Sequence, residues 1–274
     1  MAIRLKCTIQ DSYGIKEREQ LNSILEHVVI IRFSVDLNRN EFTKNIGNLL
    51  KEERLEYRFE LFEKYCFVAL SNQSVCDFKV IILIDKKLPT KYVNKLNNII
   101  KNEKNFFIHY WNKTDKLESN SWLIKYIDTS KKFLCTTRID DDDIIHYKAN
   151  ELFKTCLYKK IKNFEKRNIF HLSSGIYIHI EKDEKIYPIV CTNKSLAVFM
   201  SLVTHMNNDE YNIYYYSHDI IQQYPEINQH HIMCPNGSLF GVTNHCWEND
   251  TRYKRFAKNK KETCTLEEIY EKFK

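Results

Sequence analysis

The 274-residue sequence contains few of the residues that build flexible linkers, and it has no long apolar run. It has 5 glycines and 4 prolines, so we expect neither long flexible linkers nor a glycine-rich phosphate-binding loop. No apolar stretch approaches the roughly 20 residues of a membrane span. Residues 1–20 are polar and charged and show no secretory signal. We therefore expect a cytoplasmic protein.

The nine cysteines form no CxxC pair, and their number is odd. Several lie inside apolar segments, so we expect small buried side chains in a reducing compartment rather than a disulfide framework. A zinc site is an alternative, although the spacing of its candidate ligands matches no standard pattern. Those candidates are His230, His231, Cys234, His245 and Cys246.

The net charge is +6, from 42 basic and 36 acidic residues. This excess is too small for a nucleic-acid footprint, and we expect no nucleic-acid partner. It suits a site that receives an anionic ligand. The densest basic run, residues 252–261, predicts either a solvated helix face or a peripheral contact with an anionic membrane surface such as the inner membrane.

Strand-like and helix-like patterns alternate in the first half of the chain. Strand-like runs occupy residues 27–35, 78–84, 106–111 and 133–139. Helical spacing of apolar residues occurs over 53–70, from Pro89 to Ile100, and over 119–130. This alternation predicts an α/β fold with a mixed, mostly parallel sheet, right-handed crossovers and flanking helices.

The second half of the chain is less regular. The patterns predict helices over 147–166, 194–206 and near 266–273, an antiparallel strand pair at 174–180 and 186–191, and an aromatic-rich strand at 211–216. Residues 230–250 show no clear period and are expected to be irregular.

Four consecutive carboxylates, Asp140–Asp143, directly follow the strand at 133–139; we call them the Asp run. Open α/β sheets bind ligands at the carboxyl ends of their strands. Four adjacent carboxylates repel one another, and a hard divalent ion bound through oxygen atoms, Mn²⁺ or Mg²⁺, would make them tolerable. A solvated acidic loop is the alternative.

The spacing within the Asp run lets two carboxylates flank one cation, as in the pairs Asp140 with Asp142 and Asp141 with Asp143. A divalent cation stabilises the charge that a nucleoside diphosphate gains as a glycosidic bond breaks. A strand that ends in Asp-x-Asp after a β/α series is the layout of nucleotide-sugar glycosyltransferases of the GT-A type.

The chain also resembles the bacterial "putative rhamnosyltransferase" family. The resemblance is carried by residues 27–35 (HVVIIRFSV), 58–66 (RFELFEKYC) and 136–143 (TTRIDDDD), with weaker blocks at 201–203 and 217–219. It spans about residues 27–245. It implies a GT-A fold and transfer of a sugar from a nucleotide-diphosphate donor to a surface glycan such as capsule, lipopolysaccharide or a lipid-linked acceptor.

The resemblance implies that Asp140 and Asp142 bind the metal, with Asp143 beside them. His245 is a further candidate ligand, because imidazole suits Mn²⁺. It follows Gly241-Val242-Thr243-Asn244 where the family tends to show a His-Gly-x-Asn block. A loop histidine without a metal is the alternative for His245.

The resemblance also implies a nucleotide pocket at the strand ends. The predicted nucleotide-sugar-binding residues are Arg32, Phe33, Asp85, Arg138, Asp140 and Asp141. Arg138 contacts the diphosphate, neutralises Asp140, or does both. Asp85 has the alternative of capping a turn.

An inverting transfer needs a general base that deprotonates the acceptor hydroxyl. Asp219 is our first candidate and His218 the second, because both follow the predicted strand at 211–216. A helix N-cap is the alternative for Asp219.

We expect a single domain over 1–274, with a nucleotide-sugar-binding half (about 27–143), an acceptor-binding half (about 144–250) and a basic tail (about 251–274). Two other functions stay open. One is a metal-dependent nucleotidyl- or phosphotransferase, which would normally carry a glycine loop. The other is a basic module that binds glycan or nucleic acid without catalysis.

Overall fold

An eight-stranded sheet and a four-stranded sheet form the framework of the protein. The structure is a computed structural model. It describes residues 3–6, 14–36, 49–112, 114–161, 164, 166–180, 185–191, 196–207, 210–217, 223–234, 237–245 and 263–274. In these ranges, no helix is long and apolar enough to cross a membrane.

The larger sheet is mostly parallel, as predicted. Its strand order is β1 (Ile3–Lys6), β11 (Asn228–Met233), β7 (Asn168–Leu172), β10 (Met200–His205), β5 (Phe133–Asp140), β2 (Leu25–Phe33), β3 (Lys79–Asp85) and β4 (Phe106–Trp111). β10 runs antiparallel to both of its neighbours. Because β5, β2 and β3 are parallel neighbours, their carboxyl ends meet at one edge of the sheet. The predicted α/β fold is therefore confirmed.

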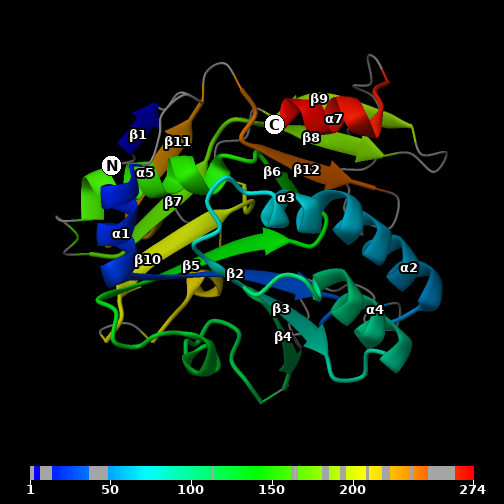
Figure 1. The fold of residues 1–274 in the computed structure, drawn as a ribbon, viewed down its shortest axis with the longest axis horizontal. Coiled ribbons are helices and arrows are strands. Elements are labelled where there is room, and N and C mark those ends of the chain that lie inside the picture. The colour runs from blue at the N-terminus through cyan, green and yellow to red at the C-terminus, as the bar shows by residue number, and fades with distance from the viewer. Residues whose placement is uncertain are drawn as a thin grey trace.

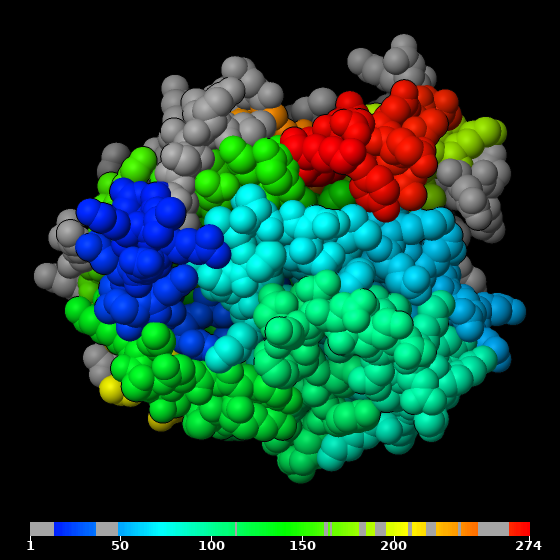
Figure 2. Space-filling model, in the orientation of Figure 1, coloured from blue at the N-terminus to red at the C-terminus, as the bar shows by residue number. Residues whose placement is uncertain are grey.

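Helices cover one face of this sheet. They are α1 (Ile15–Ile24), α2 (Glu52–Leu61), α3 (Val68–Ser71), α4 (Thr90–Ile100) and α5 (Ala149–Ile161). In Figure 1, α4 lies over the ends of β2 and β3, and the run from α3 to α2 passes above them in the view; Figure 2 shows the side chains of these helices across the middle of this face. Side chains of β2 alternate between two cores: Val29 and Ile31 pack on the helical side, whereas Val28 and Ile30 pack with Trp122 on the other.

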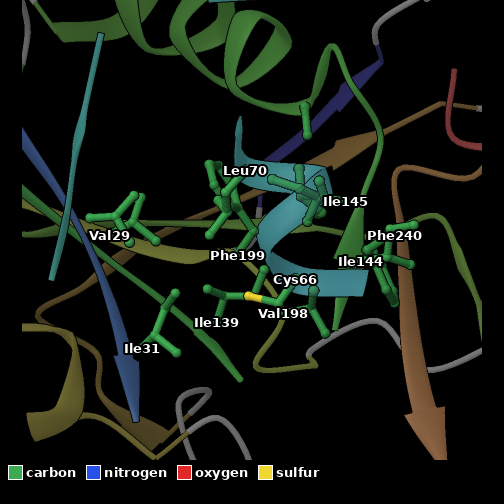
Figure 3. Packing of buried hydrophobic residues seen from close by; sticks show 14 of the residues in the cluster. Val29, Ile31, Cys66, Leu70, Ile139, Ile144, Ile145, Val198, Phe199 and Phe240 are labelled. Atoms are coloured by element: carbon green, nitrogen blue, oxygen red, sulfur yellow. The ribbon is translucent and has the colours of Figure 1, made fainter. Parts of the chain in front are cut away.

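One continuous helical run, residues 52–71, both contacts the Asp run and packs into the core. α2 and α3 are joined by a π-helical segment, Phe62–Phe67, so residues 52–71 are continuously helical. This confirms the helix predicted over 53–70. Its buried apolar stripe consists of Leu55, Phe59, Phe62, Cys66 and Leu70. Figure 3 shows Cys66 and Leu70 packed near Ile139 of β5 and Ile144.

The smaller sheet brings a distant segment back to the Asp run. Its order is β6 (Ile144–Ile145), β12 (Phe240–Asn244), β8 (Gly175–Ile180) and β9 (Ile186–Cys191), with α7 (Leu266–Lys272) beside it (Figure 1). β6 follows the Asp run at once and pairs antiparallel with β12, Gly241 opposite Ile144. A Cβ at Gly241 would lie 2.7 Å from Ile144 Cγ2, so a side chain there would push the strands apart.

Four local predictions are wrong. A 3₁₀ turn, Ile124–Tyr126, occurs where a helix was expected over 119–130, and another, Ile213–Tyr215, replaces the strand expected at 211–216. β10 lies inside the helix expected over 194–206. β11 and β12 occupy much of the segment expected to be irregular.

The error at β10 has a clear physical cause. β10 lies between β5 and β7, and its side chains from Met200 to Thr204 are buried. A strand covered on both faces reads as a continuous apolar run, and spacing alone cannot distinguish such a run from a buried helix.

Candidate functional site

The Asp run begins at the last residue of β5 and turns inward. The backbone amide of Asp143 donates to the carbonyl oxygen of Asp140 at 3.2 Å, which closes a tight turn. Asp141, Asp142 and Asp143 are 3%, 5% and 4% exposed. Buried carboxylates need compensating partners. The Asp run is therefore not a solvated loop.

One compensating partner is Arg58 on α2. Its Nε donates to Asp141 Oδ2 at 3.1 Å, and its Nη1 donates to Asp142 Oδ2 at 2.7 Å. Its Nη2 contacts Asp141 Oδ1, and its side chain is 10% exposed. Burial by itself would raise the pKa of Asp142, but Arg58 and His245 outweigh burial and hold this pKa well below its usual range. Asp142 is therefore ionised in the folded protein.

His245 follows β12 and lies against the same carboxylate. Its Nε2 is 3.0 Å from Asp142 Oδ2 and 3.0 Å from Arg58 Nη1, so this nitrogen either donates to the carboxylate or accepts from the guanidinium. The Tyr57 ring packs edge-on against the imidazole, with centroids 5.2 Å apart. Burial lowers the pKa of His245 in spite of Asp142, so the ring is neutral near pH 7. A neutral imidazole is the form that binds metals.

A second basic group, Arg32 and Arg138, lies beside Asp140 on the face of the sheet opposite the helices. Arg32 of β2 stands in register with Asp140 of β5, and its Nη2 donates to Asp140 Oδ1 at 3.0 Å. The guanidinium carbons of Arg32 and Arg138 lie 5.2 and 5.9 Å from the centroid of the Tyr214 ring. The Tyr214 hydroxyl donates to the carbonyl oxygen of Ile30 at 3.3 Å. Tyr214 thus holds two arginines beside Asp140 through cation–π contacts.

Asp85 closes the loop that follows β2. Its Oδ1 accepts from the backbone amide of Lys87 at 2.8 Å, and its Oδ2 accepts from that of Asp36 at 3.4 Å. The structure thus shows the turn-closing role, and a nucleotide contact by Asp85 stays a prediction. The side chain of Phe33 is fully buried against Phe59, with 4.6 Å between ring centroids, so a nucleotide contact by the Phe33 backbone stays a prediction.

The two predicted catalytic residues, His218 and Asp219, lie outside the described residues, and so do Cys246 and the basic run at 252–261. Their roles stay predictions.

The zinc alternative finds no support. His230 lies on β11 with its Nε2 2.9 Å from Asn168 Oδ1, whereas His245 lies at the Asp run. In the described part of the chain, no three His, Cys, Asp or Glu side chains form a group that could hold a metal ion as they stand.

From the sequence, Arg58 received no role, and Tyr214 was considered for stacking on a sugar ring, with core packing as the preferred alternative. Arg58 had a usable signal, because it lies on the apolar stripe of the predicted helix, between Leu55 and Phe59. An arginine there is buried, and a buried arginine requires an anionic partner. Tyr214 had no such signal, because it lies in the segment Tyr-Asn-Ile-Tyr-Tyr-Tyr at 211–216, which reads equally well as core.

Comparison with known proteins gives distant structural likenesses. Among solved structures, S. aureus TarS 1-349 in complex with UDP-GlcNAc is similar over 81% of this chain and 60% of that chain, with 12% identity and a TM-score of 0.40. A 4-diphosphocytidyl-2C-methyl-D-erythritol synthase from Anaerococcus prevotii is similar over 87% and 98%, with 11% identity and a TM-score of 0.37. The inositol-1-phosphate CTP transferase from T. maritima is similar over 88% and 98%, with 11% identity and a TM-score of 0.37. No curated protein matches the sequence.

A family model, in contrast, matches most of the sequence. The family described as "Putative rhamnosyl transferase" matches residues 26–237, which contain all of β2 but its first residue, the helical run with Arg58 and the whole Asp run. The resemblance stated from the sequence is therefore confirmed. The chain belongs to the "Putative rhamnosyl transferase" family and is a glycosyltransferase.

Proposed function

We propose that the protein is a metal-dependent, inverting glycosyltransferase of the GT-A type that takes a sugar from a nucleotide-diphosphate donor and places it on a bacterial surface glycan or its lipid-linked precursor. The Asp run carries the donor half of this proposal: Asp141, Asp142 and Asp143 are buried at the carboxyl edge of parallel strands. Arg32 and Arg138 lie on the side of Asp140, and His245 lies against Asp142. Ligands of open α/β sheets bind at this edge.

The residues at the Asp run have the chemistry that Mn²⁺ or Mg²⁺ requires. Carboxylate oxygens suit both ions, and a histidine that binds a metal must be neutral, as His245 is. Asp142 and His245 already converge, with 3.0 Å between Oδ2 and Nε2. Asp142 and His245 would hold the ion with Asp143 beside them, and Asp140 would have to turn away from Arg32 to join them. When bound, the ion would supply positive charge against the leaving diphosphate.

The arginines of the opposite face would bind and orient the diphosphate. Arg32 and Arg138 are partly exposed, whereas the ring of Tyr214 between them is buried. A guanidinium held on a rigid ring loses little conformational freedom when it binds an anion. Arg32 would thus keep one hydrogen bond to Asp140 and offer its remaining donors to phosphate oxygens.

The acceptor half of the proposal rests on the family and on sequence. Asp219, with His218 as second candidate, would remove the proton from the acceptor hydroxyl on the face opposite the leaving group. The acceptor class, a surface polysaccharide or lipid-linked glycan, comes from the family resemblance.

Thermal unfolding tests the donor half directly. Wild-type protein would be heated with UDP, GDP, TDP or CDP, each in the presence of Mn²⁺ or of EDTA. A ligand at 100 times its dissociation constant stabilises the folded state by about 2.7 kcal/mol. We expect one nucleotide to raise the midpoint with Mn²⁺ and not with EDTA.

The variant pair Asp142→Asn and Glu53→Gln completes this test. Both remove one negative charge, but Glu53 is exposed on α2, away from the Asp run. We expect Asp142→Asn to abolish the metal-dependent shift and Glu53→Gln to keep it. A stabilisation that is indifferent to EDTA and to Asp142→Asn would point to the binding module, and no shift with any nucleotide would contradict the proposed donor class.

A further inference from the structure

Arg58 occupies the atoms that a divalent cation would need. Its guanidinium binds both oxygens of Asp141, binds Asp142 Oδ2 at 2.7 Å, and lies 3.0 Å from His245 Nε2. A metal ion bound to Asp142 Oδ2 and His245 Nε2 would fall within contact distance of Nη1 of the same guanidinium. Two cations cannot share these lone pairs in a buried site, because their repulsion is weakly screened there.

The carboxylates of the site already have basic partners without a metal. Arg32 pairs with Asp140 and Arg58 with Asp141 and Asp142, while Arg138 and Arg54 interact electrostatically with Asp140 and Asp142. A divalent ion alone would therefore add two uncompensated charges to a buried site. A nucleoside diphosphate brings the matching negative charge.

Arg54 shows that cations are already crowded along α2. It lies one turn before Arg58, so both side chains leave the same face of the helix. Its Nη1 donates to Ser34 Oγ and to the carbonyl oxygen of Leu49, both at 3.0 Å, where β2 ends. Burial and the neighbouring charge of Arg58 lower the pKa of Arg54 to about 10. The Asp run could bind a further cation if one of these guanidinium groups left its carboxylate and paired with an anionic ligand instead.

We propose that Arg58 is the resident counter-ion of the Asp run, that a divalent cation binds by displacing it from Asp141 and Asp142, and that the displaced guanidinium binds the diphosphate of the donor. Arg58 is thereby a positioning residue that makes metal and donor bind together. The binding of the donor diphosphate by Arg58 rests on the proposed function. The displacement of Arg58 by a divalent cation does not.

The experiment measures Mn²⁺ binding by the loss of the free-Mn²⁺ EPR signal, in wild type, Arg58→Gln and the control Lys64→Gln. Lys64 is on the same helical run, pairs with Glu60 and is 41% exposed, so its loss removes one positive charge outside the site. We expect Arg58→Gln to bind Mn²⁺ at least tenfold more tightly than wild type without nucleotide. Lys64→Gln should match wild type.

The second arm adds UDP, GDP, TDP or CDP. In wild type we expect one of them to tighten Mn²⁺ binding at least tenfold, and we expect this enhancement to fall at least threefold in Arg58→Gln. An equal enhancement in both proteins would overturn the diphosphate part. If no nucleotide acts on wild type, the proposed function fails, and tighter Mn²⁺ binding by Arg58→Gln still supports the displacement.

Equal Mn²⁺ affinity of wild type and Arg58→Gln would overturn the displacement and leave Arg58 as a permanent structural ion pair. If Arg58→Gln does not fold in EDTA, Arg58→Lys provides the same comparison, because a lysine keeps the charge but cannot bind both carboxylates as a fork. We expect it to bind Mn²⁺ about threefold more tightly than wild type, and an unchanged affinity would overturn the proposal.

Discussion

The Asp run is held by arginines on two faces, and these two contacts differ in character. On the helical face, the side chains of Arg58, Asp141 and Asp142 are 10%, 4% and 7% exposed. On the opposite face, those of Arg32 and Asp140 are 29% and 45% exposed. The first pair is sealed inside the protein, whereas the second is open to an arriving ligand.

This difference decides what each pair contributes. Breaking a buried pair by removing one partner leaves a charge without compensation in a poorly solvating interior. Breaking a half-exposed pair leaves charges that water still reaches. The Arg58 pairs should therefore contribute more to stability than the Arg32 pair, and an arriving ligand should meet Arg32 before Arg58.

The largest expected effect is on stability and contrasts the two arginines directly. Without metal, Arg58→Met should lower the free energy of unfolding by about 3–5 kcal/mol, because Asp141 and Asp142 lose their guanidinium. Arg32→Met should lower it by about 1 kcal/mol or less. Urea unfolding of both variants in EDTA measures the two values. Equal losses of unfolding free energy in the two variants would show that the buried and the half-exposed ion pairs contribute alike.

A second prediction concerns how the free energy of unfolding depends on pH through two histidines outside the site. His109 and His230 lie away from the Asp run, and burial lowers the pKa of each to about 4, assisted by Lys125 at His109 and by Lys160 at His230. An unfolded histidine takes up its proton near pH 6.5, so the stability that these neutral rings contribute is present above pH 6.5 and is lost as the pH falls toward 4.

The slope should be at most about 1.4 kcal/mol per pH unit for each histidine, and smaller where water reaches the ring. His109→Gln should remove a large part of this loss, while Arg32→Met should leave it unchanged. Urea unfolding between pH 7 and 4 measures both. A pH profile of His109→Gln that overlays the wild type would contradict the assignment.

A third prediction concerns ligand binding on the open face. Arg32→Gln and Arg138→Gln should each weaken binding of the preferred nucleoside diphosphate in Mn²⁺ about tenfold, about 1.4 kcal/mol, because each removes one guanidinium held against Tyr214. Without nucleotide, the Mn²⁺ affinity of Arg138→Gln should stay within twofold of wild type, whereas that of Arg32→Gln should rise, because Asp140 loses its ion pair. Calorimetric titration provides both numbers, and Lys64→Gln is the matched control. Unchanged nucleotide affinity in both variants would place the diphosphate elsewhere.

The smallest expected effect concerns Tyr214, whose ring packs against both arginines. Tyr214→Phe keeps the ring and removes the hydroxyl that bonds the Ile30 carbonyl oxygen at 3.3 Å. We expect a loss of about 0.5–1.5 kcal/mol in the free energy of unfolding and a change in nucleotide affinity below threefold. Tyr214→Leu, which removes the ring, should weaken nucleotide binding more than Tyr214→Phe. The reverse order would show that the hydroxyl and not the ring positions the arginines.

Much of the first half of the fold could be predicted because its signals are local. The run at 106–111 and the strand at 133–139 match β4 and β5 closely, since each is an apolar segment bounded by polar or turn-forming residues. The second half could be predicted less well, because its strands depend on neighbours distant in sequence. β11 has the polar sequence Asn-Gln-His-His-Ile-Met and is stabilised in the sheet by contacts such as that of His230 with Asn168.

The sequence by itself determined that four adjacent carboxylates follow an apolar strand, and it favoured a cation beside them over a solvated acidic loop, because mutual repulsion and desolvation are properties of the residues themselves. Tertiary structure decided which groups meet that requirement. Arg58 lies 83 positions from Asp141, and His245 lies 103 positions from Asp142. Packing of α2 on the parallel sheet and pairing of β12 with β6 bring them together, and no local pattern encodes a contact over such separations.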